Sequence, residues 1–264
     1  MPYADNDGVK IFWEEAGVGD PLLLIMGLGY SHDMWNRTLP VVSERYRTIS
    51  FDNRGVGRSD VPPGPYPIPT MAADAAAVMD SAGVRRAHVF GISMGGMIAQ
   101  EFALRYPDRV RSLILGCTTH GGAEAVAADA EVITTLMARG MMSAEDGIRA
   151  MIPFIYDPAT SRQRIEEDLE IRARTYPSAA GYFAQVQGIM AFNSRSRLSQ
   201  LKVPTLVIHG ESDRLIPPEN GRLIAGLIDG ARLVMISGAS HIFPTDQPDI
   251  SHQVILDFLG EQAG

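Results

Sequence analysis

Residues 90–96 have the sequence Phe90-Gly91-Ile92-Ser93-Met94-Gly95-Gly96, which is the most informative motif of the chain. It follows a short aliphatic run, Ala87–Phe90, that predicts a buried strand, and it opens a segment of helical periodicity from about Met94 to Tyr106. The pattern Gly-x-Ser-x-Gly between a strand and a helix is typical of a nucleophile elbow, in which a serine stands at the tip of a sharp turn. Because such a turn brings backbone segments close together, the positions two residues on either side of the serine must lack side chains.

A serine hydroxyl is a weak nucleophile unless a neighbouring base activates it. The sequence should therefore supply an acid and then a histidine, each after a later strand. Glu211 and Asp213 follow one strand-like run, and His241 follows the next. We predict that Asp213 holds His241 in the required tautomer and that His241 takes the proton of Ser93. Glu211 remains the rival acid.

The same chemistry needs two backbone donors for the developing oxyanion. One is expected from the residue after the nucleophile, the N–H of Met94, at the positive end of the following helix. The other is expected from Met26-Gly27-Leu28-Gly29, which follows the apolar run Leu22–Met26. The two glycines would let the Leu28 N–H point inward, and losing one such donor typically costs about 3 kcal/mol in the transition state.

Length and charge limit the classes of function. The chain has 264 residues, enough for one large domain or two small ones, and its formal net charge is −8. This acidic balance argues against binding to nucleic acid and to an anionic membrane surface. The expected partner is a small-molecule ester or lactone, and the sequence leaves a homo-oligomer open.

The single cysteine, Cys117, allows no intrachain disulfide and no cysteine-based metal cluster, and we predict that it is a small buried side chain. No spacing of His, Asp and Glu indicates a metal site, and no cofactor is expected. His88 and His252 are predicted to be surface residues. The first residues resemble no secretory signal, and the longest apolar stretch, Pro21–Met26, is far too short to span a bilayer, so a cytoplasmic location is expected.

Short aliphatic runs alternate with helical patterns over much of the chain, which predicts a mostly parallel sheet with helices on both faces. Between Thr119 and Gln200 this alternation stops. We predict a core in two parts, residues 1–118 and 201–264, and a helical lid, residues 119–200, over the carboxyl ends of the strands. The predicted lid helices are Ala123–Arg139, Ser143–Met151, Thr160–Thr175 and Ser178–Phe192.

Together these motifs resemble the α/β-hydrolase family over nearly the whole chain. A further matching segment, Asp52–Ser59, has the pattern Asp-x-Arg-Gly-x-Gly-x-Ser and is usually structural in the family. The resemblance therefore implies no catalytic role for Asp52, Arg54 or Ser59. Many relatives carry His-Gly where this chain has Met26-Gly27, which puts the hydrogen bonding around the oxyanion loop in question. A serine nucleophile argues against the dehalogenase and epoxide hydrolase branches, which need a carboxylate.

Within the family, the segment from Asp60 to Gly83 looks most like the branch of 3-oxoadipate enol-lactonases and small esterases or lactonases. This likeness implies a serine hydrolase that cleaves an ester or lactone through an acyl-enzyme. Two alternatives use the same triad, namely carbon–carbon bond hydrolysis and the perhydrolysis of cofactor-free haloperoxidases. An alternative of another class is a ligand receptor with very slow turnover.

The predicted lid is rich in methionine and aromatic side chains, which suit an adaptable apolar pocket or hold the lid helices together. An enol-lactonase substrate would also carry a carboxylate and need a cationic partner. The sequence does not show which lid arginine faces inward, and most are expected on solvated faces. The candidate pocket residues are Gly27, Trp35, His120, Met142, Phe154 and Phe183. The lid arginines are Arg139, Arg149, Arg162, Arg164, Arg172, Arg174, Arg195 and Arg197.

Overall fold

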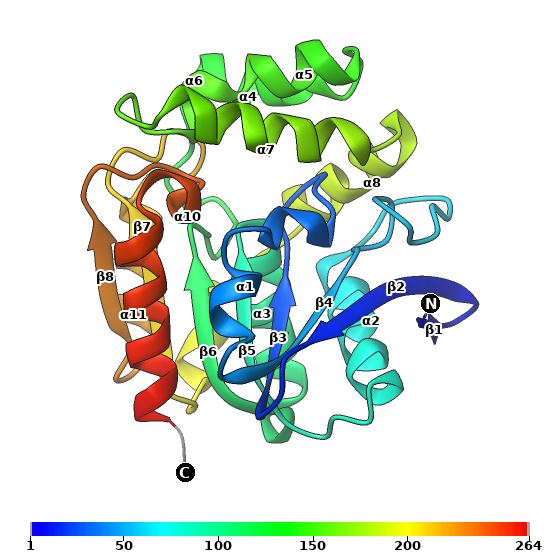
Figure 1. The fold of residues 1–264 in the computed structure, drawn as a ribbon, viewed down its shortest axis with the longest axis vertical. Coiled ribbons are helices and arrows are strands. Elements are labelled where there is room, and N and C mark those ends of the chain that lie inside the picture. Colours follow the sequence, from blue (N-terminus) through cyan, green and yellow to red (C-terminus); the bar gives the residue numbers. More distant parts are fainter. Residues whose placement is uncertain (1, 263–264) are drawn as a thin grey trace.

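The structure is a computed structural model that describes residues 2–262. Within this range eight strands form one sheet in the order β1-β2-β4-β3-β5-β6-β7-β8. The pairings β1–β2 and β2–β4 are antiparallel, and all the others are parallel (Figure 1). The predicted mostly parallel sheet is therefore confirmed. The strands are β1 (Tyr3–Asn6), β2 (Val9–Ala16), β3 (Asp20–Ile25), β4 (Tyr46–Phe51), β5 (Ala87–Ile92), β6 (Val110–Gly116), β7 (Thr205–Gly210) and β8 (Arg232–Ile236).

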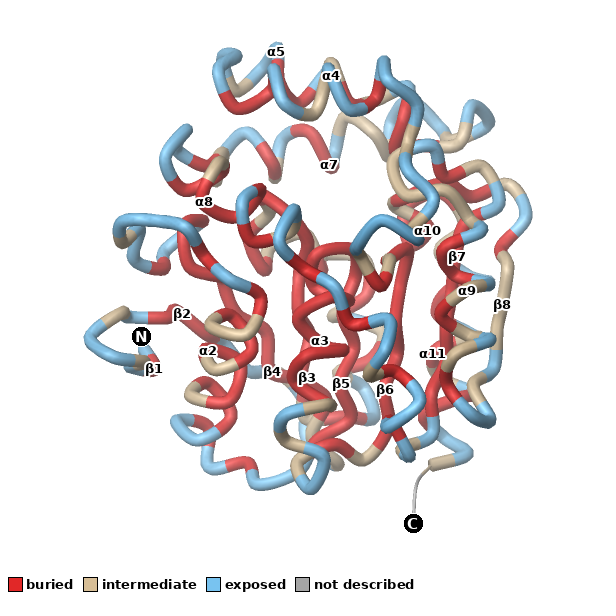
Figure 2. Tube along the Cα trace, turned by 180° about the vertical axis from the view of Figure 1, so that it is seen from behind, coloured by how far each residue is buried: buried red, intermediate tan, exposed pale blue. Residues whose placement is uncertain are grey.

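The parallel strands are buried on both faces, which explains their continuous apolar runs. Along β3, Leu22 and Leu24 pack into one core cluster, whereas Leu23 and Ile25 pack into the other. The first cluster lies under α1 and α11, and the second lies under α2, α3 and α9. Figure 2 shows these central strands as almost wholly buried. The helices are α1 (Leu39–Val42), α2 (Ile68–Ser81), α3 (Met94–Arg105), α9 (Glu219–Leu227), α10 (Phe243–Asp246) and α11 (Pro248–Glu261), with short 3-10 turns η1 (His32–Trp35), η2 (Pro107–Arg109) and η3 (Arg195–Gln200).

A run of helices between β6 and β7 crosses the carboxyl edge of the sheet (Figure 1). Its two ends meet, because Gly121 and Asn193 form an isolated β-bridge and the Ser194 N–H donates to the His120 carbonyl at 2.9 Å. The chain therefore leaves the core and returns to it at one place. The helices are α4 (Ala130–Arg139), α5 (Ala144–Ala150), α6 (Ile152–Ile155), α7 (Arg162–Arg174) and α8 (Ala179–Met190).

Three features of the helices differ from the sequence prediction. The first helix of this run begins at Ala130 and not at Ala123, so that the preceding residues form a loop. The short α6 was not predicted. In the core, the sequence predicts a helix from about Thr70 to Gly83, but α2 begins at Ile68, because a proline in its first turn needs no N–H partner there.

Two histidines predicted on the surface are buried, which corrects the prediction. His88 lies within β5, where both faces of the sheet are covered, and its Nδ1 is 2.8 Å from Ser112 Oγ. His252 lies on the inner side of α11, with Nε2 3.3 Å from Thr38 Oγ1. Cys117 is buried, as predicted. Among residues 2–262 no helix is long and apolar enough to cross a bilayer.

Candidate active site

Ser93 stands at the junction of β5 and α3 with φ 84° and ψ −115°, a backbone conformation that serine rarely adopts. The flanking glycines make the turn sterically feasible. A Cβ on Gly91 would overlap the carbonyl oxygen of Gly95, and a Cβ on Gly95 would overlap that of Ile25. The spacing of glycines around Ser93 therefore follows from the close approach of three backbone segments.

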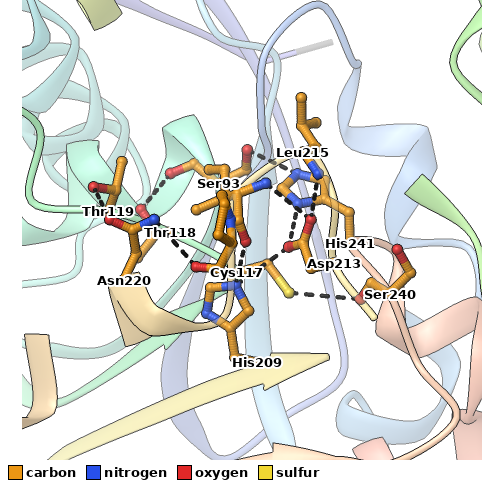
Figure 3. A network of polar contacts seen from close by, with 12 residues as sticks. Ser93, Cys117, Thr118, Thr119, His209, Asp213, Leu215, Asn220, Ser240 and His241 are labelled. Carbon is orange, nitrogen blue, oxygen red and sulfur yellow. Dashed lines mark hydrogen bonds and ion pairs between the residues drawn. The ribbon is translucent and has the colours of Figure 1, made fainter. Parts of the chain in front are cut away.

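The elbow brings Ser93 to His241 and Asp213, which follow β8 and β7 respectively (Figure 3). His241 Nε2 is 3.0 Å from Ser93 Oγ, and His241 Nδ1 is 2.8 Å from Asp213 Oδ2. All three side chains are buried. Glu211, the rival acid, is exposed. The three side chains can thus relay a proton from the serine to an imidazole that a carboxylate orients.

The Asp213 carboxylate is held on both oxygens. Its Oδ1 accepts hydrogen bonds from the N–H groups of Leu215 and Ile216 at 2.9 Å each. Its Oδ2 lies 3.3 Å from His209 Nε2 and also contacts His241 Nδ1. Burial raises the pKa of Asp213, but the charge of His241 and the hydrogen bonds from His209 and His241 lower it well below its ordinary value overall. The carboxylate therefore stays ionised at neutral pH.

His209 is a neighbour of the site that the sequence prediction missed, because it reads as an ordinary strand residue. Its Nε2 also lies 2.8 Å from the Ile216 carbonyl oxygen. Cys117 Sγ, one ring nitrogen of His209 and one carboxylate oxygen of Asp213 all lie within 4.8 Å of one another. Burial raises the pKa of the Cys117 thiol well above its ordinary value, and the thiol contacts the Ser240 carbonyl at 3.7 Å.

The loop after β3 borders Ser93 directly. A Cβ on Gly27 would lie 3.1 Å from the Ser93 Cβ. The N–H groups of Leu28 and Met94 donate to no acceptor among the described residues, and both residues line the same cavity as Ser93. The next amide, that of Gly29, is bound at 2.9 Å by Gln185 Oε1 from α8. Two free amides thus remain beside the serine.

The segment Asp52–Ser59 supports this loop, as the family resemblance implies. Asn53 Nδ2 donates to the Met26 carbonyl at 2.8 Å, which fixes the backbone at the start of this loop. The Arg54 guanidinium is paired with Asp74 through two hydrogen bonds of 2.6 Å. These contacts are structural, and none of them reaches Ser93.

A cavity of about 320 Å³ opens on Ser93 and His241. Two of the candidate pocket residues, Gly27 and Trp35, line it. Its walls are largely apolar and come from the loops after β3 and β6, from α4 and from the segment after β8. Further lining residues include Tyr30, Met97, Val126, Val132, Leu136, Arg139, Met151, Ile189, Leu215 and Ile242.

The other four candidates lie outside this lining. His120 is fully buried where the helical run leaves the core, with its Nδ1 2.7 Å from the Gly121 carbonyl. Phe154 packs among the helices, and the Phe183 ring lies edge-on to Tyr182. Met142 is 37% exposed. Residue type alone favours these side chains, but none of the four contributes to the lining of the cavity.

Arg139 lines the cavity, whereas the sequence alone does not show which lid arginine faces inward. It is only 2% exposed, although lid arginines were mostly expected on solvated faces. A signal was present, since Val132, Leu136 and Arg139 follow the spacing i, i+4, i+7 and therefore share one face of α4. The apolar character of that face predicts that Arg139 points inward.

Comparisons with known proteins agree with this geometry. The profile of the alpha/beta hydrolase fold family matches residues 20–248. A protein of Azorhizobium caulinodans with the provisional name carbamate hydrolase RutD is 33% identical over 269 residues, covering 99% of each chain. The 3-oxoadipate enol-lactonase 2 of Acinetobacter baylyi is 28% identical, over 89% of this chain and 86% of its own.

A solved structure gives the same result in three dimensions. The enol-lactonase of Burkholderia xenovorans superposes with a TM-score of 0.88 at 26% identity, covering 98% of this chain and 100% of that one. The family profile spans most of the chain and includes the elbow, the acid and the histidine. The chain therefore belongs to the alpha/beta hydrolase family.

Proposed function

We propose that this hydrolase cleaves a carboxylic ester or a lactone through a covalent acyl-enzyme on Ser93. The observation that carries the proposal is the unbroken line of polar contacts from Asp213 through His241 to Ser93, which ends in a largely apolar cavity. The similarity to enol-lactonases in sequence and structure supports a lactone or a small ester as the substrate.

In the first half of the reaction, Ser93 Oγ attacks the carbonyl carbon while its proton passes to His241 Nε2. The electron pair of the C=O bond moves to the oxygen, where the N–H groups of Leu28 and Met94 stabilise the negative charge. When the carbonyl forms again, the bond to the alkoxide breaks and His241 returns the proton to it. An alcohol leaves, or in a lactone stays tethered to the acyl group.

In the second half, a water molecule replaces the alcohol. His241 takes a proton from the water, and the resulting hydroxide attacks the acyl carbon. The bond to Ser93 Oγ then breaks, and His241 protonates the serine. A carboxylic acid is released and the enzyme returns to its starting state, with no cofactor consumed.

The helical run, residues 119–200, acts in this proposal as a lid that excludes water and shapes the substrate site. Two of its helices support this role, since α4 and α8 both contribute residues to the lining of the cavity. Esters are favoured over peptides as substrates, because an alkoxide leaves more readily than an amine.

A carbamate is a second candidate substrate, favoured by the 33% identity to the protein provisionally named as a carbamate hydrolase. A carbamate presents an acyl carbon to Ser93 in the same way. Attack on a carbamate would need the same base, His241, and the same two backbone amides, those of Leu28 and Met94.

The decisive experiment compares wild type with Ser93→Ala, after both are shown to be folded by circular dichroism. The substrates are p-nitrophenyl acetate and butyrate, a series of lactones in a pH-indicator assay, and ethyl carbamate. We expect turnover of esters or lactones that Ser93→Ala lacks. Turnover confined to the carbamate would support the second candidate.

Inactivity on all of these substrates by a folded wild type would contradict the proposal. Product analysis with a 1,5-dioxo substrate and with acetate plus hydrogen peroxide would then test the carbon–carbon hydrolase and perhydrolase alternatives. Thermal stabilisation by a small molecule without turnover would instead favour the receptor.

A further inference from the structure

Arg139 is the last residue of α4 and contributes to the wall of the cavity that holds Ser93. Its side chain is 2% exposed, yet its Nε and Nη2 atoms have no hydrogen-bond partner among residues 2–262. No ion pair within 4.0 Å joins it to a carboxylate in the same range. Buried N–H groups without an acceptor are unfavourable, because the hydrogen bonds that water would make to them are lost.

The surroundings of Arg139 are aromatic. Its Cζ lies 5.1 Å from the ring centre of Tyr30, 5.6 Å from that of Tyr176 and 5.3 Å from that of Tyr182. The hydroxyls of Tyr176 and Tyr182 donate to the carbonyls of Arg139 and Leu136, at 2.8 Å each. The rings therefore stack on the cation without neutralising its charge.

The guanidinium stays charged in this setting. Burial lowers the pKa of Arg139, but the phenol groups of Tyr30, Tyr182 and Tyr176 raise it above its ordinary value overall. Arginine is in any case the side chain that does not release its proton in proteins.

The cavity itself supplies no counter-charge. None of the described residues that line it is Asp or Glu. Arg37 also lines it, but its Nη2 is already paired with Glu167 at 2.7 Å and with Asp168 at 3.2 Å. Arg139 is thus the one cationic side chain of the described lining that lacks a carboxylate partner.

We propose that Arg139 binds a carboxylate group of the substrate, so that the substrate is an anionic ester or lactone whose reactive carbonyl lies at Ser93. This inference rests on the function proposed above and narrows its substrate class. A carboxylate suits the site because its two oxygens match two N–H groups of the guanidinium fork. The apolar walls between Arg139 and Ser93 would then hold the carbon chain that separates the two groups.

The first test compares neutral and anionic esters that share one leaving group. The neutral ester is p-nitrophenyl butyrate, and the anionic esters are the mono-p-nitrophenyl esters of succinate, glutarate and adipate, whose carboxylates lie at increasing distance from the carbonyl. We expect wild type to show a higher kcat/KM for at least one anionic ester than for butyrate. In Arg139→Met this ratio should fall roughly 10- to 100-fold, as expected for the loss of a hydrogen-bonded buried charge pair.

Arg172 offers a matched control. It is also 2% exposed, and its Cζ lies 4.7 Å from the same Tyr30 ring, but it does not line the cavity. Arg172→Met should therefore leave the ratio of anionic to neutral kcat/KM within about twofold of wild type. Arg139→Lys should keep part of the preference, because the charge remains while the fork is lost.

A second readout does not depend on turnover. Glutarate at millimolar concentration should raise the Tm of wild type and of Arg172→Met, whereas Arg139→Met should show no such shift. The uncharged analogue 1,5-pentanediol should raise the Tm of none of them.

The outcomes separate the two proposals. The role of Arg139 would be overturned if wild type hydrolysed the neutral ester at least as fast as all three anionic esters and glutarate caused no Tm shift. The proposed serine hydrolase activity would remain in that case. A loss of the preference in Arg172→Met as large as in Arg139→Met would also overturn it. Absence of hydrolysis of every ester by wild type would instead contradict the proposed function.

Discussion

At the scale of single residues, two carboxylates two positions apart in the sequence have different surroundings. Asp213 is buried, accepts two backbone N–H groups and faces His241 at 2.8 Å, whereas Glu211 is exposed to solvent. An ionised buried carboxylate can fix the imidazole tautomer, and an exposed one that makes no contact with the imidazole has no such effect.

We therefore expect Asp213→Asn to lower kcat on p-nitrophenyl butyrate by roughly ten-thousand-fold, because the amide would favour the wrong tautomer of His241. Glu211→Gln, the matched control from the same loop, should stay within about twofold of wild type. Steady-state kinetics on both variants checks this, and the opposite ranking would show that Glu211 is the acid.

His88 shows how burial changes a titratable group. Burial in β5 and the charge of Arg111 lower the pKa of His88 from 6.5 to about 4. Above pH 6.5 the histidine is neutral in the folded and unfolded states and has no effect on the pH dependence. Between pH 6.5 and 4 only the unfolded state takes up the proton, so acid favours unfolding.

Because the pKa of His88 is lower in the folded than in the unfolded state, the unfolding free energy of wild type should fall by about 3 kcal/mol as the pH falls from 6.5 to 4. His88→Asn, whose amide reaches the position of Nδ1 beside Ser112, should show a flatter profile over this window. Urea unfolding at several pH values measures both curves. Parallel curves for the two proteins would contradict the buried, uncharged state of His88.

At the scale of elements, α8 fixes the loop that holds the candidate oxyanion donors. Gln185 Oε1 accepts the Gly29 N–H at 2.9 Å, and its Nε2 donates to the Arg54 carbonyl at 2.8 Å. A single buried side chain from the helical run therefore joins two loops of the core. The position of the Leu28 amide depends on this contact, because Gly29 is its direct neighbour.

Gln185→Leu should lower kcat on p-nitrophenyl butyrate by about tenfold and the unfolding free energy by roughly 1–3 kcal/mol, since the buried Gly29 N–H loses its acceptor. Gln187→Leu, at an exposed position of the same helix, is the control and should change neither quantity appreciably. A loss of stability with unchanged kcat would show that Gln185 acts on the fold alone.

At the scale of the whole molecule, one carboxylate joins the helical run to two parts of the core. Asp168 of α7 accepts hydrogen bonds from Arg37 at 3.2 and 3.3 Å and from Thr245 of α10 at 2.6 Å. It also accepts the hydroxyl of Tyr156 at 3.1 Å. Because Arg37 and Thr245 also line the cavity, this junction connects the attachment of the helices to the shape of the site.

Asp168→Asn removes the charge while keeping the shape. It should lower the unfolding free energy by about 3 kcal/mol, because the buried charged network loses one member. Glu166→Gln, which breaks the exposed pair with Arg149, should have a much smaller effect, because water screens the charges of an exposed pair. Urea unfolding compares the two variants, and limited proteolysis should detect faster cleavage within residues 119–200 of Asp168→Asn. Equal effects of the two substitutions would contradict a special role for Asp168.

Short stretches of the sequence predict much of the fold and of the candidate site. The glycines around Ser93 predict the elbow because only glycine fits where backbone segments nearly touch, and the continuous apolar runs predict a parallel sheet because both of its faces are covered. Ser93, Asp213 and His241 could be predicted to lie at one edge of the sheet, since each follows a strand, and their side chains meet there. These features depend on short stretches of chain, which is why the sequence alone revealed them.

Tertiary structure alone decided which side chains meet from distant segments. The choice of Asp213 over Glu211 depends on the turn after β7, and the contact of Gln185 with Gly29 joins positions 156 residues apart. The inward rotation of α4, which buries Arg139 in the wall of the cavity that holds Ser93, arises from packing of whole helices on the core. Helix rotation and loop contacts are set by the sum of many weak packing interactions, and residue type at a single position does not encode that sum.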